Sequence, residues 1–135
     1  MKTAGLGKSH KLCSATAIER LFDGRGSSSS MLAYPIRAVW AEGESVQGSH
    51  ATERVKFMIS VPKKRVRHAV DRVKMRRRVR EAYRLARPRL VPPLSSDAAT
   101  PVVHLAFLYV GNGIEPYERV RKAMERILRK MFQEQ

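Results

Sequence analysis

The segment Ala69–Arg87, AVDRVKMRRRVREAYRLAR, gathers arginine and lysine side chains that are opposed only by Asp71 and Glu81. Like charges three or four residues apart on a helix repel each other by a few tenths of a kcal/mol per pair. Phosphate groups would turn that repulsion into attraction, and the planar guanidinium of arginine is suited to bind two phosphate oxygens at once. These residues therefore indicate polyanion binding.

Residues suited to catalysis are scattered. The four histidines, His10, His50, His68 and His104, are far apart in the sequence, and no cluster of carboxylates has the pattern of a metal site. We interpret His104, which lies in an apolar stretch, as a core residue. Cys13 is the single cysteine, which rules out an internal disulfide and favours an inert thiol. The sequence thus predicts no active site and no metal site built by the protein alone.

Composition limits the class of protein. A chain of 135 residues, 43% of them apolar, fits a single domain over 1–135, with a basic arm at 1–12 and a tail at 133–135. Its 27 basic and 12 acidic residues give a net charge of +15, which favours nucleic acid over a membrane surface as the partner. No apolar run approaches the ~18 residues of a membrane-spanning helix, and the N-terminal segment lacks the apolar stretch of a secretory signal. We therefore expect a cytoplasmic protein.

The elements that must position the charges follow from the apolar periodicity. Thr16 and Glu19 have the spacing of a helix capping box, and Pro35 implies an edge or strand-start position. The expected order is α-β-β-α-β-α, an α+β sandwich with one small sheet packed with helices. In chain order we expect a helix after Thr16, a possible short strand around 27–30, a strand at 31–40, a polar loop at 41–53, a strand at 54–61, a helix at 67–88 ended near Pro88, a loop at 88–101, a strand at 102–110 buried on both faces and a helix at 115–133.

A helical wheel divides the basic segment into two faces. One arc is apolar and is expected to face the core: Met75, Val79, Ala82, Tyr83, Ala86 and Leu90. A neighbouring arc carries Arg76, Arg80, Arg84 and Arg87, and Arg77, Arg72, Lys74 and Arg78 widen it. The last helix has its own apolar stripe, formed by Tyr117, Val120, Met124, Ile127, Leu128 and Met131.

The order of the motifs resembles the signature of the bacterial ribonuclease P protein subunit. Lys63-Lys64-Arg65 follows a strand, then come Ala69-Val70-Asp71-Arg72, Arg76-Arg77 and Arg80-Glu81. The family usually has Asn where this chain has Val73, so the chain departs from the family pattern at that position. The resemblance extends over roughly residues 6–132.

The resemblance implies a function and a fold. The family's protein assists a catalytic RNA that uses magnesium, held mainly by the RNA, to remove the 5′ leader of precursor tRNA as a hydrolytic endonuclease; the protein alone is expected to be inactive. It also implies a left-handed βαβ crossover, as in the second domain of ribosomal protein S5. The RNA-binding residues implied by the resemblance and by the charge pattern are Lys63, Lys64, Arg65, Arg67, Arg72, Lys74, Arg76, Arg77, Arg80 and Arg84.

A cleft for the leader is implied beside the sheet. A groove for single-stranded RNA combines apolar or aromatic platforms with positive charge. The candidates are Ile18, Phe22, Arg37, Val39, Lys56 and Met58, although Ile18 and Phe22 serve equally well as core residues.

Three other readings stay open at this point. A different RNA-binding protein on a similar scaffold, such as a ribosomal protein, explains the charge but not the order of the motifs. A DNA-binding module is disfavoured because no helix-turn partner precedes the basic helix. An autonomous nuclease lacks a candidate site.

Overall fold

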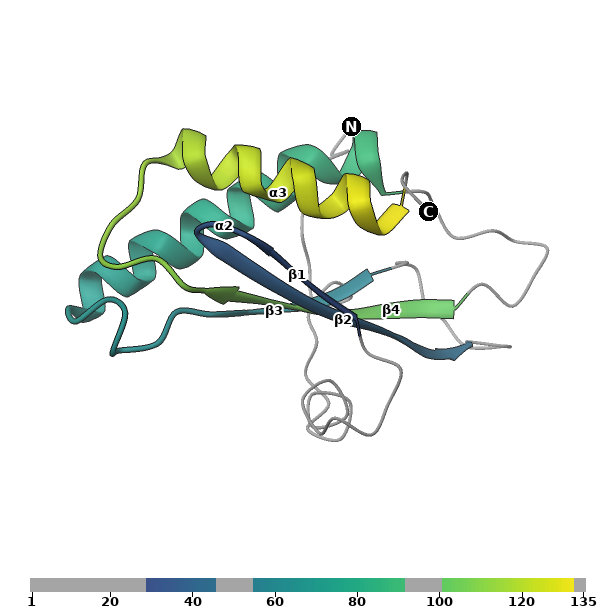
Figure 1. Ribbon diagram of the computed structural model, residues 1–135, viewed down its shortest axis with the longest axis horizontal. Helices are drawn as coiled ribbons and strands as arrows, with labels where there is room; N and C mark the ends of the chain where they lie inside the picture. Colours follow the sequence, from purple (N-terminus) through teal and green to yellow (C-terminus); the bar gives the residue numbers. More distant parts are fainter. Residues whose placement is uncertain (1–28, 46–54, 92–100, 133–135) are drawn as a thin grey trace, which may run out of the picture.

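The computed structural model describes residues 29–45, 55–91 and 101–132, and these form one four-stranded sheet with two helices on one face (Figure 1). The elements are β1 (Ser29–Ala33), β2 (Ile36–Ser45), β3 (Val55–Ser60), α2 (Ala69–Leu90), β4 (Pro101–Tyr109) and α3 (Tyr117–Phe132). The strand order is β1-β2-β4-β3. β2 is antiparallel to both β1 and β4, whereas β3 runs parallel to β4 and is joined to it through α2. The α+β class and the βαβ connection are confirmed; the left-handed sense of the crossover stays a prediction.

The single strand expected at 31–40 is wrong, because this segment is a hairpin. β1 ends at Ala33, Tyr34 and Pro35 form the turn, and β2 begins at Ile36. Pro35 has no N–H for a strand ladder, and its carbonyl oxygen accepts a bond from the N–H of Val110 at 2.8 Å. Pro35 therefore lies in a turn directly before a strand, where its missing N–H removes no hydrogen bond from the sheet.

The prediction of a loop at 41–53 is also wrong for its first residues, which belong to β2. β2 continues to Ser45 because it pairs with β4 from Ile36 to Glu42 and again at Ser45. The register shifts between Glu42 and Ser45. The polar composition of 41–45 suggested a loop, because the strand that pairs with this segment, β4, is distant in the sequence.

Helix α2 runs to Leu90, two residues beyond its expected end at Pro88. A proline in the last turn removes only its own N–H from the ladder, and two contacts extend the helix past it. Leu90 is buried in the core, and the N–H of Val91 donates to the carbonyl oxygen of Arg87 at 3.0 Å. The predicted core face of this helix is confirmed at all six positions: Met75, Val79, Ala82, Tyr83, Ala86 and Leu90.

The core lies between the sheet and the two helices. Phe57 on β3, Tyr83 on α2 and Phe107 on β4 meet there, with ring centroids 4.6 to 6.0 Å apart and tilted planes. Such tilted pairs stabilise beyond the burial of their area. β4 is central and is covered on both faces, since Phe107 and Ala106, which point to opposite faces, are each no more than 1% exposed.

Helix α3 packs on the same side of the sheet, next to α2 and over β1 and β2 (Figure 1). Its predicted stripe is confirmed: Val120, Met124, Ile127 and Leu128 are buried, and Tyr117 and Met131 pack at the margin of the core. The N-terminal arm, the helix expected after Thr16, Cys13, Ile18 and Phe22 lie outside the described residues.

Truncating Phe107 tests the aromatic cluster as the centre of the core. We expect Phe107→Ala to lower the free energy of unfolding by about 3–5 kcal/mol, because the cavity that it leaves adjoins three elements. Leu85→Ala is the control for an exposed apolar side chain, since Leu85 on α2 is 47% exposed and its truncation should cost no more than about 0.5 kcal/mol. Urea unfolding measures both, and equal losses would place the core elsewhere.

Candidate nucleic-acid interface

Helix α2 presents a row of cations on the face turned away from the core. Lys74, Arg76, Arg77 and Arg80 are exposed, whereas Met75 and Val79 between them are almost completely buried. The 3.6-residue period of the helix produces this separation. Arg76 and Arg77 have no ion-pair partner among the described residues, so their charges remain available to a polyanion. We call these four side chains the basic row.

The loop that leads into α2 extends the basic row. It is fixed at both ends by the buried side chains of Val61 and Val66, and the carbonyl oxygen of Pro62 accepts the N–H groups of Arg65 at 3.0 Å and Val66 at 3.1 Å. The side chains of Lys63, Lys64 and Arg67 are exposed on it.

The same loop is attached to the turn between β4 and α3. The N–H of Gly113 donates to the carbonyl oxygen of Arg65 at 2.8 Å, and the Arg65 guanidinium donates to Oδ1 of Asn112 at 3.3 Å. Gly113 has a φ of +78°, a conformation that glycine adopts without strain. Arg65 is thus only partly exposed, and part of its hydrogen-bonding capacity is used within the protein.

Two arginines predicted to bind RNA have partners inside the protein. Arg72 donates to the carbonyl oxygens of Val66 at 3.1 Å and Arg67 at 2.9 Å, and thereby closes the loop onto the helix. Arg84 pairs with Glu81, and its hydrogen bonds hold the pKa of the Glu81 carboxyl below its ordinary value. Their contact with RNA stays a prediction, but Arg72 has a structural role that the charge pattern did not reveal.

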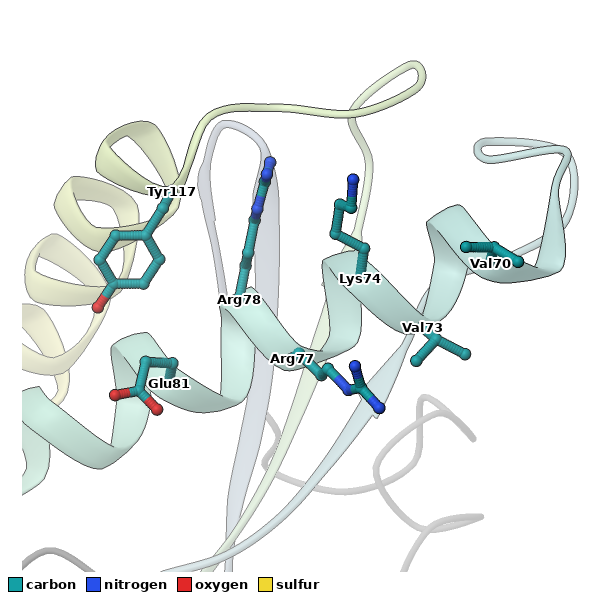
Figure 2. Close-up of a pocket in the computed structure, with 7 residues that line it drawn as sticks. All are labelled: Val70, Val73, Lys74, Arg77, Arg78, Glu81 and Tyr117. Carbon is teal, nitrogen blue, oxygen red and sulfur yellow. The ribbon is translucent and has the colours of Figure 1, made fainter.

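A hollow of about 630 Å³ lies between α2 and the start of α3 (Figure 2). Val70 and Val73 form an apolar wall, and Tyr117 on α3 stands opposite Glu81 on α2. The hydroxyl of Tyr117 is buried without a hydrogen-bond partner, and burial raises its pKa. Lys74, Arg77 and Arg78 supply the positive charge of the hollow.

Sequence reasoning missed Tyr117 and Arg78 as parts of this site. Tyr117 was assigned to the apolar stripe of α3, which is correct but incomplete. Arg78 was included in the cationic arc, yet its guanidinium reaches across to donate to the carbonyl oxygen of Glu115. Only the packing of α3 beside α2 brings the two together, and no spacing within the sequence indicates it.

Four of the residues predicted for the leader cleft meet on the sheet face opposite the helices, which we call the far face. Val39 on β2 is paired with Ala106, and Ala106 with Met58 on β3, so the three form one cross-strand row. Arg37 and Lys56 occupy neighbouring positions, opposite Leu108 and His104 respectively. Val39 and Ala106 are almost completely buried, whereas Met58 and Lys56 are partly exposed and Arg37 is exposed. Apolar surface beside cations is the combination that binds single-stranded RNA.

The described residues offer neither a cluster of metal ligands nor a membrane-spanning helix. Among the described residues, no group of three or more histidine, cysteine, aspartate or glutamate side chains comes close enough to hold a metal ion. The described helices include none that is long and apolar enough to span a bilayer.

Known proteins provide an independent comparison. The family model described as Ribonuclease P matches residues 6–132. The ribonuclease P protein components of two Porphyromonas gingivalis strains are each 32% identical over 126 residues, which cover 93% of this chain and 85% of theirs.

Solved structures agree at the level of the fold. The RNase P protein of Staphylococcus aureus superimposes with a TM-score of 0.65 at 13% identity, over 90% of this chain and 94% of that one. A mutant of the S. aureus protein described as defective in mRNA degradation gives 0.63, over 92% and 89% of the two chains. The family match over nearly the whole sequence and the relatives at 32% identity establish that this chain belongs to the ribonuclease P protein family.

Proposed function

We propose that this chain, as the protein subunit of ribonuclease P, binds the catalytic RNA through the basic row of α2 and the loop before it. The observation that carries the proposal is the division of α2 into a buried apolar arc and an exposed row of cations. Solvated helix faces usually mix charges of both signs, whereas this one presents a nearly uniform field that phosphates would neutralise.

The far face of the sheet is proposed to bind the 5′ leader of precursor tRNA. Met58, which is partly exposed beside the buried Val39, would provide apolar surface for bases, and the cations of Arg37 and Lys56 on either side of this row would bind the flanking phosphates. Together, the two surfaces would place the leader at a fixed position relative to the catalytic RNA. A protein that positions a substrate in this way can raise the reaction rate even when another subunit carries out the bond cleavage.

Magnesium is proposed to be held by the RNA. The described side chains include no group that fits a metal site held by the protein, so the proposed function gives the protein no metal-dependent step of its own. The contribution of the protein is electrostatic, since its cations reduce the repulsion between the two RNA molecules that must approach each other. We also propose that the protein is cytoplasmic, because catalytic RNA and precursor tRNA meet in the cytoplasm.

Reconstitution tests the assignment of the chemistry. We expect the RNA-free protein to leave precursor tRNA intact, and addition of the catalytic RNA at low magnesium to give 5′-leader cleavage that exceeds the activity of the RNA alone. Gel analysis of 5′-labelled precursor measures the product. Cleavage by the purified protein alone would overturn the assignment of catalysis to RNA.

Charge removal separates the binding residues from the structural ones. We expect Arg76→Gln/Arg77→Gln to keep its thermal stability, to bind the catalytic RNA more weakly and to lower the slope of log affinity against log salt by about 2. Arg72→Gln is the contrasting variant, because the loss of its two bonds to carbonyl oxygens should lower the melting temperature. A stable, fully binding double variant would exclude the basic row as the contact.

Val73 tests the departure from the family pattern. It is 37% exposed at the edge of the hollow between α2 and α3, and valine and asparagine differ little in helix propensity. We expect Val73→Asn to leave the melting temperature almost unchanged and the affinity for the catalytic RNA equal or modestly tighter, since asparagine adds hydrogen-bonding groups. The buried Val79→Asn is the positive control for destabilisation. A loss above about 2 kcal/mol at Val73 would mark it as a core residue.

A further inference from the structure

A second groove lies at the opposite edge of the sheet from α2. It has a volume of about 310 Å³ and runs between the β1–β2 hairpin turn and α3. β1 is the edge strand farthest from β3, and α3 is the helix that packs against it, whereas α2 packs against β3. The groove is therefore separate from the basic row and from the hollow beside Tyr117.

An exposed aromatic ring forms one wall of this groove. Tyr34, in the hairpin turn, is 50% exposed. Its hydroxyl donates to Oε1 of Glu115 at 3.2 Å, and Oε2 of the same carboxylate pairs with Arg119 at 3.1 Å. The ring is thus held in place by its hydroxyl while much of its surface stays in contact with solvent. Burial does not explain a tyrosine at this position.

The opposite wall is cationic. Lys122 and Arg126 lie one helical turn apart on α3, both are exposed, and neither has an ion-pair partner among the described residues. Glu118 also lines the groove, but its carboxylate is paired with Arg121. The neighbouring carboxylate of Glu125 is likewise paired with Arg121 and Arg89. The acidic side chains of this part of α3 therefore form their ion pairs with arginines, and neither of the two cations in the groove takes part in those pairs.

We propose that this groove binds an unpaired stretch of RNA, with one base stacked on Tyr34 and the adjoining phosphates on Lys122 and Arg126. An exposed aromatic ring beside a cationic track is the arrangement that binds single strands without sequence preference. A double helix would not use it, because its bases are stacked on each other and their faces are closed. The inference rests on the proposed function for the identity of the partner as RNA, but it concerns a surface that the proposed function does not use.

The aromatic ring and the charges are tested separately in the full chain. The probes are a short unstructured RNA oligonucleotide and a duplex RNA of the same length. We expect Tyr34→Leu to weaken binding of the oligonucleotide about five- to tenfold, the lower part of the range for one stacked base, and Tyr34→Phe to keep most of the affinity. Neither change should affect binding of the duplex. Thermal melting of each variant confirms that the hairpin is intact.

The charges are tested with a matched pair of variants on one helix. We expect Lys122→Gln/Arg126→Gln to lower the salt slope for the oligonucleotide by about 1.4, as two phosphate contacts on a single strand imply. Arg129→Gln/Lys130→Gln removes the same charge from the last turn of α3, outside the groove, and should change the slope much less. Polyglutamate serves as an acidic-peptide probe and should not respond to Tyr34→Leu.

The possible failures are distinguishable. Equal losses in Tyr34→Leu and Tyr34→Phe, equal slope changes in the two charge variants, or a response of polyglutamate to Tyr34→Leu would each overturn the groove as a single-strand site. If the wild-type chain binds the catalytic RNA through the basic row but all groove variants bind the oligonucleotide normally, only this inference fails. If the wild-type chain binds neither RNA, the proposed function fails first.

Discussion

The contact between the apolar arc of α2 and the aromatic residues of the sheet is the constraint on which the rest of the structure depends. A helix with so many neighbouring cations is electrostatically unfavourable by itself. Tyr83, packed between Phe57 and Phe107, and the fully buried Met75 fix the orientation of the helix about its own axis. Once that orientation is fixed, the basic row can only face outward. The proposed RNA-binding surface is therefore a consequence of core packing, and a rotation of α2 would remove both together.

Those parts of the fold that follow from local periodicity were predictable from the sequence. The six core positions of α2 and the apolar stripe of α3 repeat every three or four residues, and this period is a property of the helix alone. The hairpin at Pro35 and the extension of β2 to Ser45 were missed because they depend on pairing with other strands. The composition of 31–40 suits one strand or two, and the distinction comes from β4, about 65 residues later in the chain.

The candidate site shows the same division. The residue types and spacing identified the exposed cations Lys74, Arg76 and Arg77, since charge and helical phase suffice for that. They did not separate these from Arg72, whose guanidinium binds two carbonyl oxygens of the preceding loop. Nor did they identify Tyr117, because its position beside Glu81 arises only when α3 packs on α2. A sequence reports which side chains can bind phosphate, and the tertiary structure decides which of them are already occupied.

The turn between β4 and α3 is attached by two hydrogen bonds to the side of the molecule that carries the basic row. The N–H of Gly113 donates to the Arg65 carbonyl oxygen, and the Arg78 guanidinium donates to the carbonyl oxygen of Glu115. The carboxylate of Glu115 in turn accepts the hydroxyl of Tyr34 at the far edge of the sheet. Gly113 and Glu115, two residues of this one connection, are therefore hydrogen-bonded to the loop before α2, to α2 and to the β1–β2 turn. If RNA segments bind at both edges of the domain as proposed, these bonds would hold them at a constant separation, and the protein would act as a rigid spacer for the RNA as well as a source of positive charge.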